Sequence, residues 1–368
     1  MGLTLLKCRH ISDIVLRMWM SQVKSKPFFW IGHLALAGLV GIAPAPAGAQ
    51  TPAAAGARTA KPAAPAVAPK AAPKPTTQYS ATRARNRRAA LARARAAALA
   101  RELAEELPRL KADATGLLVP DLRAEAAIIY DPATNEVLWE ENSQTQRSIA
   151  SITKVMTATV FLENDPDLSQ KVTIARSDVL RASTTFLRAN DQVTTGDLLH
   201  LLLIASDNAA SRALGRASPH GLPGFIKRMN EKAAELGLTS TQYADPSGLD
   251  PGNVSSAYDM ARLITYVSGD PRLTEVMQKP THAFQTGRAE VTVRSTNQLV
   301  RTGEVDVLAG KTGFIRRAGY CLATLLRLPD GSRQVAVVVL GARSNASRFS
   351  EARSLFDWFS STADSLLE

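Results

Sequence analysis

The chain has 368 residues, of which 45% are hydrophobic and 21% are charged, so it is long enough for two domains with a substantial core. Its formal net charge of +11 is unevenly distributed, because residues 51–101 carry eleven Lys or Arg and no Asp or Glu. Residues 102–368 carry 28 basic and 32 acidic residues and are mildly acidic. No nucleic-acid partner is expected, since the arginine-rich segment 81–107 contains no aromatic residue that could stack on a base.

The N-terminal segment has the pattern of an export signal. An apolar run at residues 28–43 follows Lys24 and Lys26 and precedes a stretch of Pro, Ala and Gly. This order predicts a cleavable signal over residues 1–49, cut near Ala49, and therefore a periplasmic protein. A membrane anchor is the alternative, and it is disfavoured because the run is shorter than the ~20 residues that span a bilayer. A loose association with the membrane or the wall stays open.

Two N-terminal segments of unusual composition follow. Residues 50–80 are rich in Ala, Pro and Lys and predict an extended linker, because proline removes backbone donors and little apolar bulk is available. Residues 81–110 predict a basic Ala/Arg helix built mainly from strong helix formers. The simplest interpretation is a solvated or weakly docked helix. The alternative is that residues 51–101 form a basic arm that contacts an anionic envelope surface.

Cysteine and histidine usage excludes two classes of site. Cys8 would leave with the signal, so Cys321 would stand alone and no internal disulfide would form. The five histidines show neither a His-Glu-x-x-His motif nor paired metal-ligand spacing. A zinc peptidase is therefore not expected, and no cofactor is expected.

A compact domain is predicted over residues 117–368. Residues 126–142 predict two strands joined by a turn, and the Pro- and Gly-rich segment 243–253 predicts a loop. The other predicted elements are helices at 151–163, 196–206 and 222–237, strands at 307–314, 319–328 and 333–342, and a final helix at 346–367. This order predicts a three-layer α/β (α+β) fold, in which helices flank an antiparallel five-stranded sheet and a further helical region is inserted.

Ser151-Ile-Thr-Lys154 is the first candidate catalytic motif. The composition of 27 serines and 13 lysines predicts about one chance match, and the second match in the chain, Ser21 to Lys24, lies in the export segment. On a helix, positions i and i+3 share one face, so the two side chains can meet. The helix start also supplies free N–H groups that can stabilise an oxyanion.

Ser206-Asp207-Asn208 is the second candidate motif, between two helical runs. Ser, Asp and Asn are favoured helix caps, so a purely structural role is the alternative. Ser295-Thr296-Asn297 has the same Ser-x-Asn pattern, and we interpret it as a loop or strand edge.

Lys311-Thr312-Gly313 is the third candidate motif and the rarest by composition. It is not a phosphate-binding loop, because position 305 is Val where that motif requires Gly. Arg301-Thr302-Gly303 is a near miss that lacks the following long strand.

The order Ser-x-x-Lys, Ser-x-Asn, Lys-Thr-Gly, with starts 55 and 105 residues apart, resembles that of the penicillin-recognising serine acyltransferases, whose fold is β-lactamase/transpeptidase-like. From about residue 124 onward, stretches such as ASITKVMTA, LLIASDNAA, YADPSGLDPGN and AGKTGFIRRAGYCLAT look like the D-alanyl-D-alanine carboxypeptidase/endopeptidase family of low-molecular-mass penicillin-binding proteins. Within it they resemble the endopeptidase branch, of the penicillin-binding protein seven type. One departure is Ser148, where the family often has proline.

The resemblance implies a nucleophile and a base. Ser151 would attack the carbonyl of a D-alanyl residue in peptidoglycan stem peptides, and β-lactam antibiotics would inhibit by acylating the same hydroxyl. Lys154 can accept the serine proton only as a neutral amine. Burial and a nearby cation, Lys311, would each lower its pKa.

The resemblance also implies the roles of the remaining site residues. Ser206 and Lys311 would relay a proton to the departing amine, and Asn208 would orient the peptide. Lys311, Thr312 and Gly313 would hold the substrate's terminal carboxylate or its equivalent. The oxyanion would lie between the backbone N–H groups of Ser151 and Phe314.

Three alternatives to a D,D-endopeptidase remain. A β-lactamase is disfavoured because no Glu-x-x-Leu-Asn pattern follows the Ser-x-Asn motif. A D-alanyl-D-alanine carboxypeptidase would use the same catalytic groups. A non-catalytic wall-binding or penicillin-sensing protein is the alternative from another class.

Overall fold

The computed structural model describes residues 78–106, 109–331 and 333–367. The predicted export signal and most of the predicted linker lie outside these ranges. The last three linker residues instead begin the basic helix, α2, which spans Gln78–Glu106. None of the helices within the described ranges is long and apolar enough to cross a membrane.

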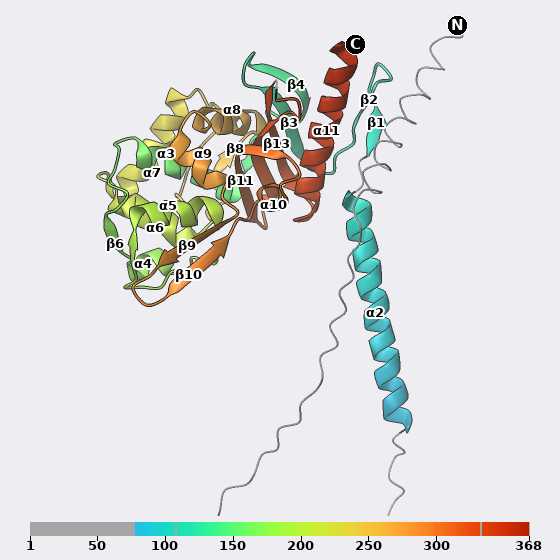
Figure 1. Cartoon of the computed structure of the whole chain (residues 1–368), viewed down its shortest axis with the longest axis horizontal. Helices are drawn as coiled ribbons and strands as arrows, with labels where there is room; N and C mark the ends of the chain where they lie inside the picture. Colours follow the sequence, from blue (N-terminus) through green and yellow to red (C-terminus); the bar gives the residue numbers. More distant parts are fainter. Residues whose placement is uncertain (1–77, 107–108, 332, 368) are drawn as a thin grey trace, which may run out of the picture. The chain divides into compact units, whose positions relative to one another are not determined.

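The centre of the fold is an antiparallel five-stranded sheet, in the order β11-β12-β13-β3-β4 (Figure 1). Its strands are β3 Ala126–Asp131, β4 Glu136–Glu141, β11 Asp306–Ile315, β12 Gly319–Arg327 and β13 Gln334–Ala342. The predicted fold class is confirmed, and all five predicted strands are present. Because β11 lies at the edge of the sheet, one side of its backbone is left open for other contacts.

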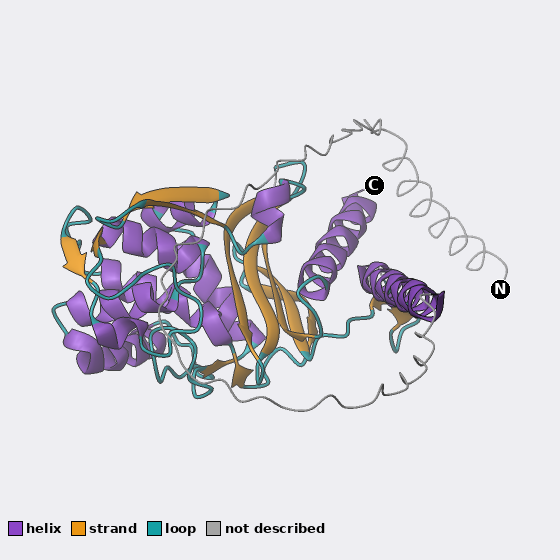
Figure 2. Ribbon diagram, turned by 90° about the horizontal axis from the view of Figure 1, so that it is seen from below, coloured by secondary structure: helices purple, strands orange, loops and turns teal. Residues whose placement is uncertain are grey.

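Both faces of the sheet are buried, which follows from the alternation of side chains along each strand. On β3, Ile128 and Tyr130 join the core shared with the inserted helices. Their neighbours Ala127 and Ile129 join a second core on the other face, with Phe349 from the terminal helix α11 Ser347–Leu367. Figure 2 shows the resulting three layers, with α11 on one side of the sheet and the inserted helices on the other.

The inserted region is more complex than the sequence predicted. The three predicted helices are present as α3 Thr153–Leu162, α5 Thr195–Ile204 and α7 Gly221–Glu235. Five further helices are α4 Arg176–Val179, α6 Asn208–Ala217, α8 Ala257–Val267, α9 Pro271–Met277 and α10 Gln298–Thr302. Short strand pairs are β1 Leu110–Ala112 with β2 Leu118–Pro120, β5 Arg147–Ser148 with β8 Val254–Ser255, β6 Lys171–Thr173 with β7 Gln192–Thr194, and β9 Thr281–Gln285 with β10 Glu290–Arg294. Except for β9 and β10, which have five residues each, these strands have only two or three residues, which is too little periodicity to be recognised from sequence.

The packing of α11 on the sheet can be tested at Phe349, whose side chain is 1% exposed. We expect Phe349→Ala to lower the free energy of unfolding by about 3–5 kcal/mol, because it removes buried apolar surface and leaves a cavity. Phe186→Ala is the control, since that ring is 43% exposed and should cost less than about 1 kcal/mol. Equal losses in denaturant titrations of the two variants would contradict this account of the second core.

Candidate active site

Ser151 and Lys154 meet at the start of α3. Ser151 lies in a single 3₁₀ turn, Ala150–Ile152, and Lys154 is in the first turn of the α-helix that follows it. The Nζ of Lys154 is 2.9 Å from the Oγ of Ser151. Lys154 has no exposed surface, while Ser151 is partly exposed. A hydroxyl that a ligand can reach is therefore in direct contact with a fully buried amine.

The other partners of Lys154 match a neutral amine. Its Nζ donates to the Oδ1 of Asn208 at 2.6 Å and to the backbone carbonyl of Ser247 at 2.5 Å. A neutral amine has two N–H groups, and these two carbonyl oxygens can accept both. Its lone pair is then left for the third neighbour, the hydroxyl of Ser151. The arrangement can take the hydroxyl proton without losing a hydrogen bond.

The electrostatic setting favours the same protonation state. Burial lowers the pKa of Lys154 to about 7, and Arg212 adds to the lowering, although Asp245 and Asp207 oppose it. Burial also lowers the pKa of Lys311 well below its usual value, with the charges of Lys154 and Arg348 acting in the same direction. Burial, the first predicted cause, lowers the pKa of Lys154. Repulsion between the two lysines, the second predicted cause, lowers the pKa of Lys311 instead.

Strand β11 and the loop after α5 bring in the other predicted residues. Lys311 is buried, and its Nζ donates to the Oγ of Ser206 and to the carbonyl of Thr312, each at 2.9 Å. Phe314, two residues after Thr312, is 50% exposed, and its ring stacks on that of Tyr320 with 4.3 Å between centroids. The three motifs thus converge on one place from α3, the α5–α6 loop and β11.

Asn208 contacts Lys154 and a backbone carbonyl. Its Oδ1 accepts from Lys154 and its Nδ2 donates to the carbonyl of Ala182 at 2.7 Å, which leaves its second amide N–H for the substrate contact expected from sequence. Asp207 caps α6, since its carboxylate accepts from the N–H of Ala210. The motif therefore contains a helix cap, Asp207, between two residues that contact the buried lysines.

Two glycines allow the chain segments around Ser151 to approach one another. A Cβ on Gly313 would stand 2.7 Å from the carbonyl oxygen of Ile149 and 3.1 Å from the nitrogen of Ser151. A Cβ on Gly248 would stand 2.0 Å from the carbonyl oxygen of Ala150. Only residues without a side chain fit at these two positions.

Strained backbone accompanies the two serines. Ala150, directly before Ser151, has φ of 49°, and Ser206 has φ of 59°. Left-handed conformations are unfavourable for residues with a Cβ and persist only where the surroundings enforce them. They commonly occur at functional sites.

Sequence reasoning missed the loop 243–253 as a part of the site. Asp245 accepts from the backbone N–H groups of Ser247 and Gly248, and from the side-chain amide of Asn253. These bonds fix the carbonyl of Ser247 against Lys154. The Pro and Gly residues of the loop were a visible signal, but a backbone carbonyl has no signature of its own in a sequence.

Two further residues beside β11 were also missed. Thr296, in the Ser-x-Asn match interpreted as loop, has its Oγ1 2.6 Å from the Oγ1 of Thr312. Arg348 of α11 is buried and donates to the carbonyls of Gly313 and Cys321, at 3.0 and 3.3 Å. Thr296 therefore extends the site beside Thr312, and Arg348 holds the edge strand β11 in place.

This combination of fold and site defines the penicillin-recognising serine enzymes, and solved structures support that class. The Streptomyces K15 DD-transpeptidase superposes with a TM-score of 0.61 at 26% identity, covering 66% of this chain and 98% of that one. Penicillin binding protein 5 from Haemophilus influenzae also gives 0.61 at 26% identity, over 66% of this chain and 72% of that one.

Sequence comparison specifies the family. A family model described as D-alanyl-D-alanine carboxypeptidase matches residues 113–344. The D-alanyl-D-alanine endopeptidase of Haemophilus influenzae is 34% identical over 242 residues, 65% of this chain and 83% of that protein. Its Escherichia coli counterpart is 32% identical over 251 residues, 67% and 80% of the two chains. The chain belongs to the D-alanyl-D-alanine carboxypeptidase family and is a serine hydrolase.

The close approach at Gly248 can be measured against a matched glycine. Gly248 and Gly287 have φ of +80° and +79°, but no atom lies within 4 Å of a Cβ built on Gly287. Gly287→Ala should therefore cost only the left-handed penalty, about 1–2 kcal/mol. We expect Gly248→Ala to lower the free energy of unfolding by about 1–3 kcal/mol more, because its methyl group meets backbone. Equal losses would mean that the loop 243–253 can move away from Ala150 freely.

Proposed function

We propose that this enzyme is a periplasmic serine D,D-endopeptidase that cleaves D-alanyl cross-links of peptidoglycan through an acyl-Ser151 intermediate and is inhibited by penicillin. The observation that carries the proposal is the 2.9 Å contact between the buried amine of Lys154 and the hydroxyl of Ser151. Peptidoglycan stem peptides are the substrate class in this proposal, and β-lactams acylate the same serine.

In the first half-reaction, Lys154 takes the proton from Ser151 while the serine Oγ bonds to the carbonyl carbon of the D-alanyl residue. The carbonyl oxygen becomes an oxyanion, and the backbone N–H groups of Ser151 and Phe314 donate hydrogen bonds to it. Preorganised donors of this kind stabilise an oxyanion strongly. The absence of a side chain on Gly313 supports this placement, because it brings β11 against the turn that holds Ser151.

The intermediate then collapses. The peptide C–N bond breaks, the departing amine receives a proton, and the acyl group stays on Ser151 as an ester. Ser206 and Lys311 form the relay that carries the proton from Lys154 to that amine, supported by the 2.9 Å bond between them, and Lys154 is then neutral again. A water molecule next attacks the ester carbonyl and Lys154 accepts its proton. Lys154 passes this proton to the Oγ of Ser151 as the ester C–O bond breaks, which regenerates the serine and releases the acid.

Substrate is held along the edge strand. Lys311 and Thr312 bind the terminal carboxylate or the equivalent group of the cross-link, next to Gly313 and the exposed ring of Phe314. Asn208 orients the substrate peptide through its side-chain amide, and its Oδ1 also positions Lys154.

Endopeptidase activity is favoured over carboxypeptidase activity by the extent of the matches. The relatives named D-alanyl-D-alanine endopeptidase align over 78–83% of their length. Those named D-alanyl-D-alanine carboxypeptidase align over 61–67% of theirs. Because the same catalytic groups serve both reactions, carboxypeptidase activity is the second candidate.

Charge supports an envelope location. Residues 51–101 carry eleven cations and no anion, and the arm they form contacts anionic groups of the envelope. Residues 1–49 direct export to the periplasm.

Product analysis distinguishes the two candidates. Incubation of the enzyme with purified sacculi should convert cross-linked muropeptide dimers to monomers, and Ser151→Ala should leave them intact, because no acyl-enzyme can form. Chromatography of the digested muropeptides is the measurement. Release of free D-alanine with dimers unchanged would replace the endopeptidase with a carboxypeptidase.

The rate of acylation should follow the ionisation of Lys154. Because the neutral amine is the base and its pKa is about 7, the rate should be constant at high pH and fall roughly tenfold per unit below pH 7. Labelled penicillin measures this rate, with Ser151→Ala as the unlabelled control. A rate that is independent of pH between 5 and 8 would contradict the role of Lys154.

Acylation without turnover of any peptide would indicate a penicillin-sensing protein.

A further inference from the structure

Helix α2 presents a dense, fully exposed set of cations. Every described side chain from residue 83 to residue 100 is exposed. The six arginines in this stretch are Arg83, Arg85, Arg87, Arg88, Arg93 and Arg95, here called the α2 arginines, and Arg101 follows further along the same helix. At ~1.5 Å of rise per residue they occupy about 18 Å of helix, so one positive charge falls in about every 3 Å. No Asp or Glu lies between residues 51 and 101 to neutralise them.

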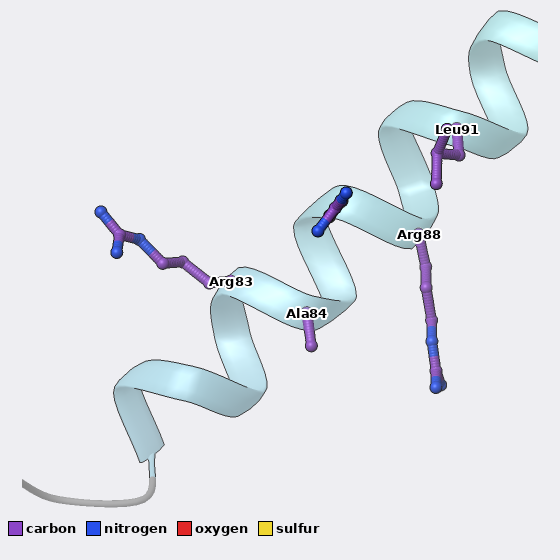
Figure 3. Close-up of a pocket in the computed structure, with 5 residues that line it drawn as sticks. Arg83, Ala84, Arg88 and Leu91 are labelled. Carbon is purple, nitrogen blue, oxygen red and sulfur yellow. The ribbon is translucent and has the colours of Figure 1, made fainter.

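The α2 arginines surround the helix and do not share one face. With 3.6 residues per turn, no sector wider than about 80° lacks a guanidinium group. Figure 3 shows this over one turn, where Arg83 and Arg88 project to different sides of the ribbon. The residues drawn there, Arg83, Ala84, Arg87, Arg88 and Leu91, line an open space between side chains on the helix surface.

This distribution does not suit a membrane surface. A helix that lies in a bilayer interface needs an apolar stripe at least about 100° wide opposite its cations. Between residues 83 and 100 the apolar residues other than alanine are Leu91 and Leu99, which are 53% and 57% exposed and are separated by two turns. A flat anionic surface would also leave the arginines on the far side of the helix unpaired.

The helix carries an electrostatic cost that an anionic polymer would relieve. Arg83 and Arg87 are spaced i, i+4, and Arg85 and Arg88 are spaced i, i+3, and like charges at these spacings destabilise a helix. Anionic strands that surround the helix can pair with guanidinium groups on every side. The net positive charge that attracts such a polymer lies in the arm, because residues 102–368 carry 28 basic and 32 acidic residues.

We propose that α2 is a second binding site for the polymer that the catalytic domain cuts, and that it binds carboxylate groups of peptidoglycan strands on all sides of the helix. This inference rests on the proposed function. Holding the enzyme on the mesh raises the effective concentration of cross-links at Ser151 without adding any contact at the active site.

The test uses the full chain with all six α2 arginines changed to Gln, and a control with the same six changed to Lys, which keeps the charge. Pelleting with purified sacculi at low and high salt measures binding. Hydrolysis of sacculi and of a soluble D-alanyl-D-alanine peptide measures activity. We expect the Gln variant to show a Kd and a KM for sacculi raised by about tenfold or more and little remaining salt dependence, with the soluble peptide cleaved at the wild-type rate. The Lys control should remain within about threefold of wild type.

Two results would overturn the proposal. One is unchanged pelleting of the Gln variant on sacculi. The other is tighter wild-type binding to vesicles of phosphatidylethanolamine and phosphatidylglycerol than to sacculi, which would make the partner a lipid surface. If the wild-type chain cleaves neither substrate, the proposed function fails, while the pelleting comparison still decides the role of α2.

Discussion

The site depends on one fully buried amine that three oxygen atoms hold in place. Lys154 is enclosed by the Asn208 side-chain carbonyl, the Ser247 backbone carbonyl and the Ser151 hydroxyl. Burying an unpaired amine would be costly, and these contacts remove that cost. Burying a charged ammonium costs more than burying a neutral amine, and this difference lowers the pKa of Lys154 to about 7. Burial therefore produces a base near neutral pH from a residue that is ordinarily a cation.

Holding these groups in place requires three chain segments to touch at backbone distance. Gly248 and Gly313 allow the loop 243–253 and strand β11 to approach the turn at Ser151 from two sides. Asp245 organises the first segment, and Arg348 reaches from the terminal helix to the carbonyl of Gly313 in the second. The left-handed backbone beside both serines is consistent with packing that leaves the chain no relaxed alternative.

The basic residues of the chain are concentrated in residues 51–101, apart from the catalytic motifs. The catalytic region is mildly acidic overall, and the two lysines of its site are buried with lowered pKa values. Much of the excess positive charge lies on the exposed helix α2, outside the three catalytic motifs. Exposed charges of this kind are screened by salt over about 10 Å, so the attraction that they exert depends on ionic strength.

The sequence by itself determined the motif order, the five strands of the sheet, the terminal helix and the basic helix, because alternation, helix propensity and short-range spacing are local properties. It also paired Ser151 with Lys154, since both lie within one turn. Only the tertiary structure placed the Ser247 carbonyl, turned Asn208 toward Lys154 and brought Thr296 to Thr312. Those contacts join residues 16 to 93 positions apart, and one of them is made by a backbone atom that every residue possesses. Packing decides such contacts, and no local pattern encodes them.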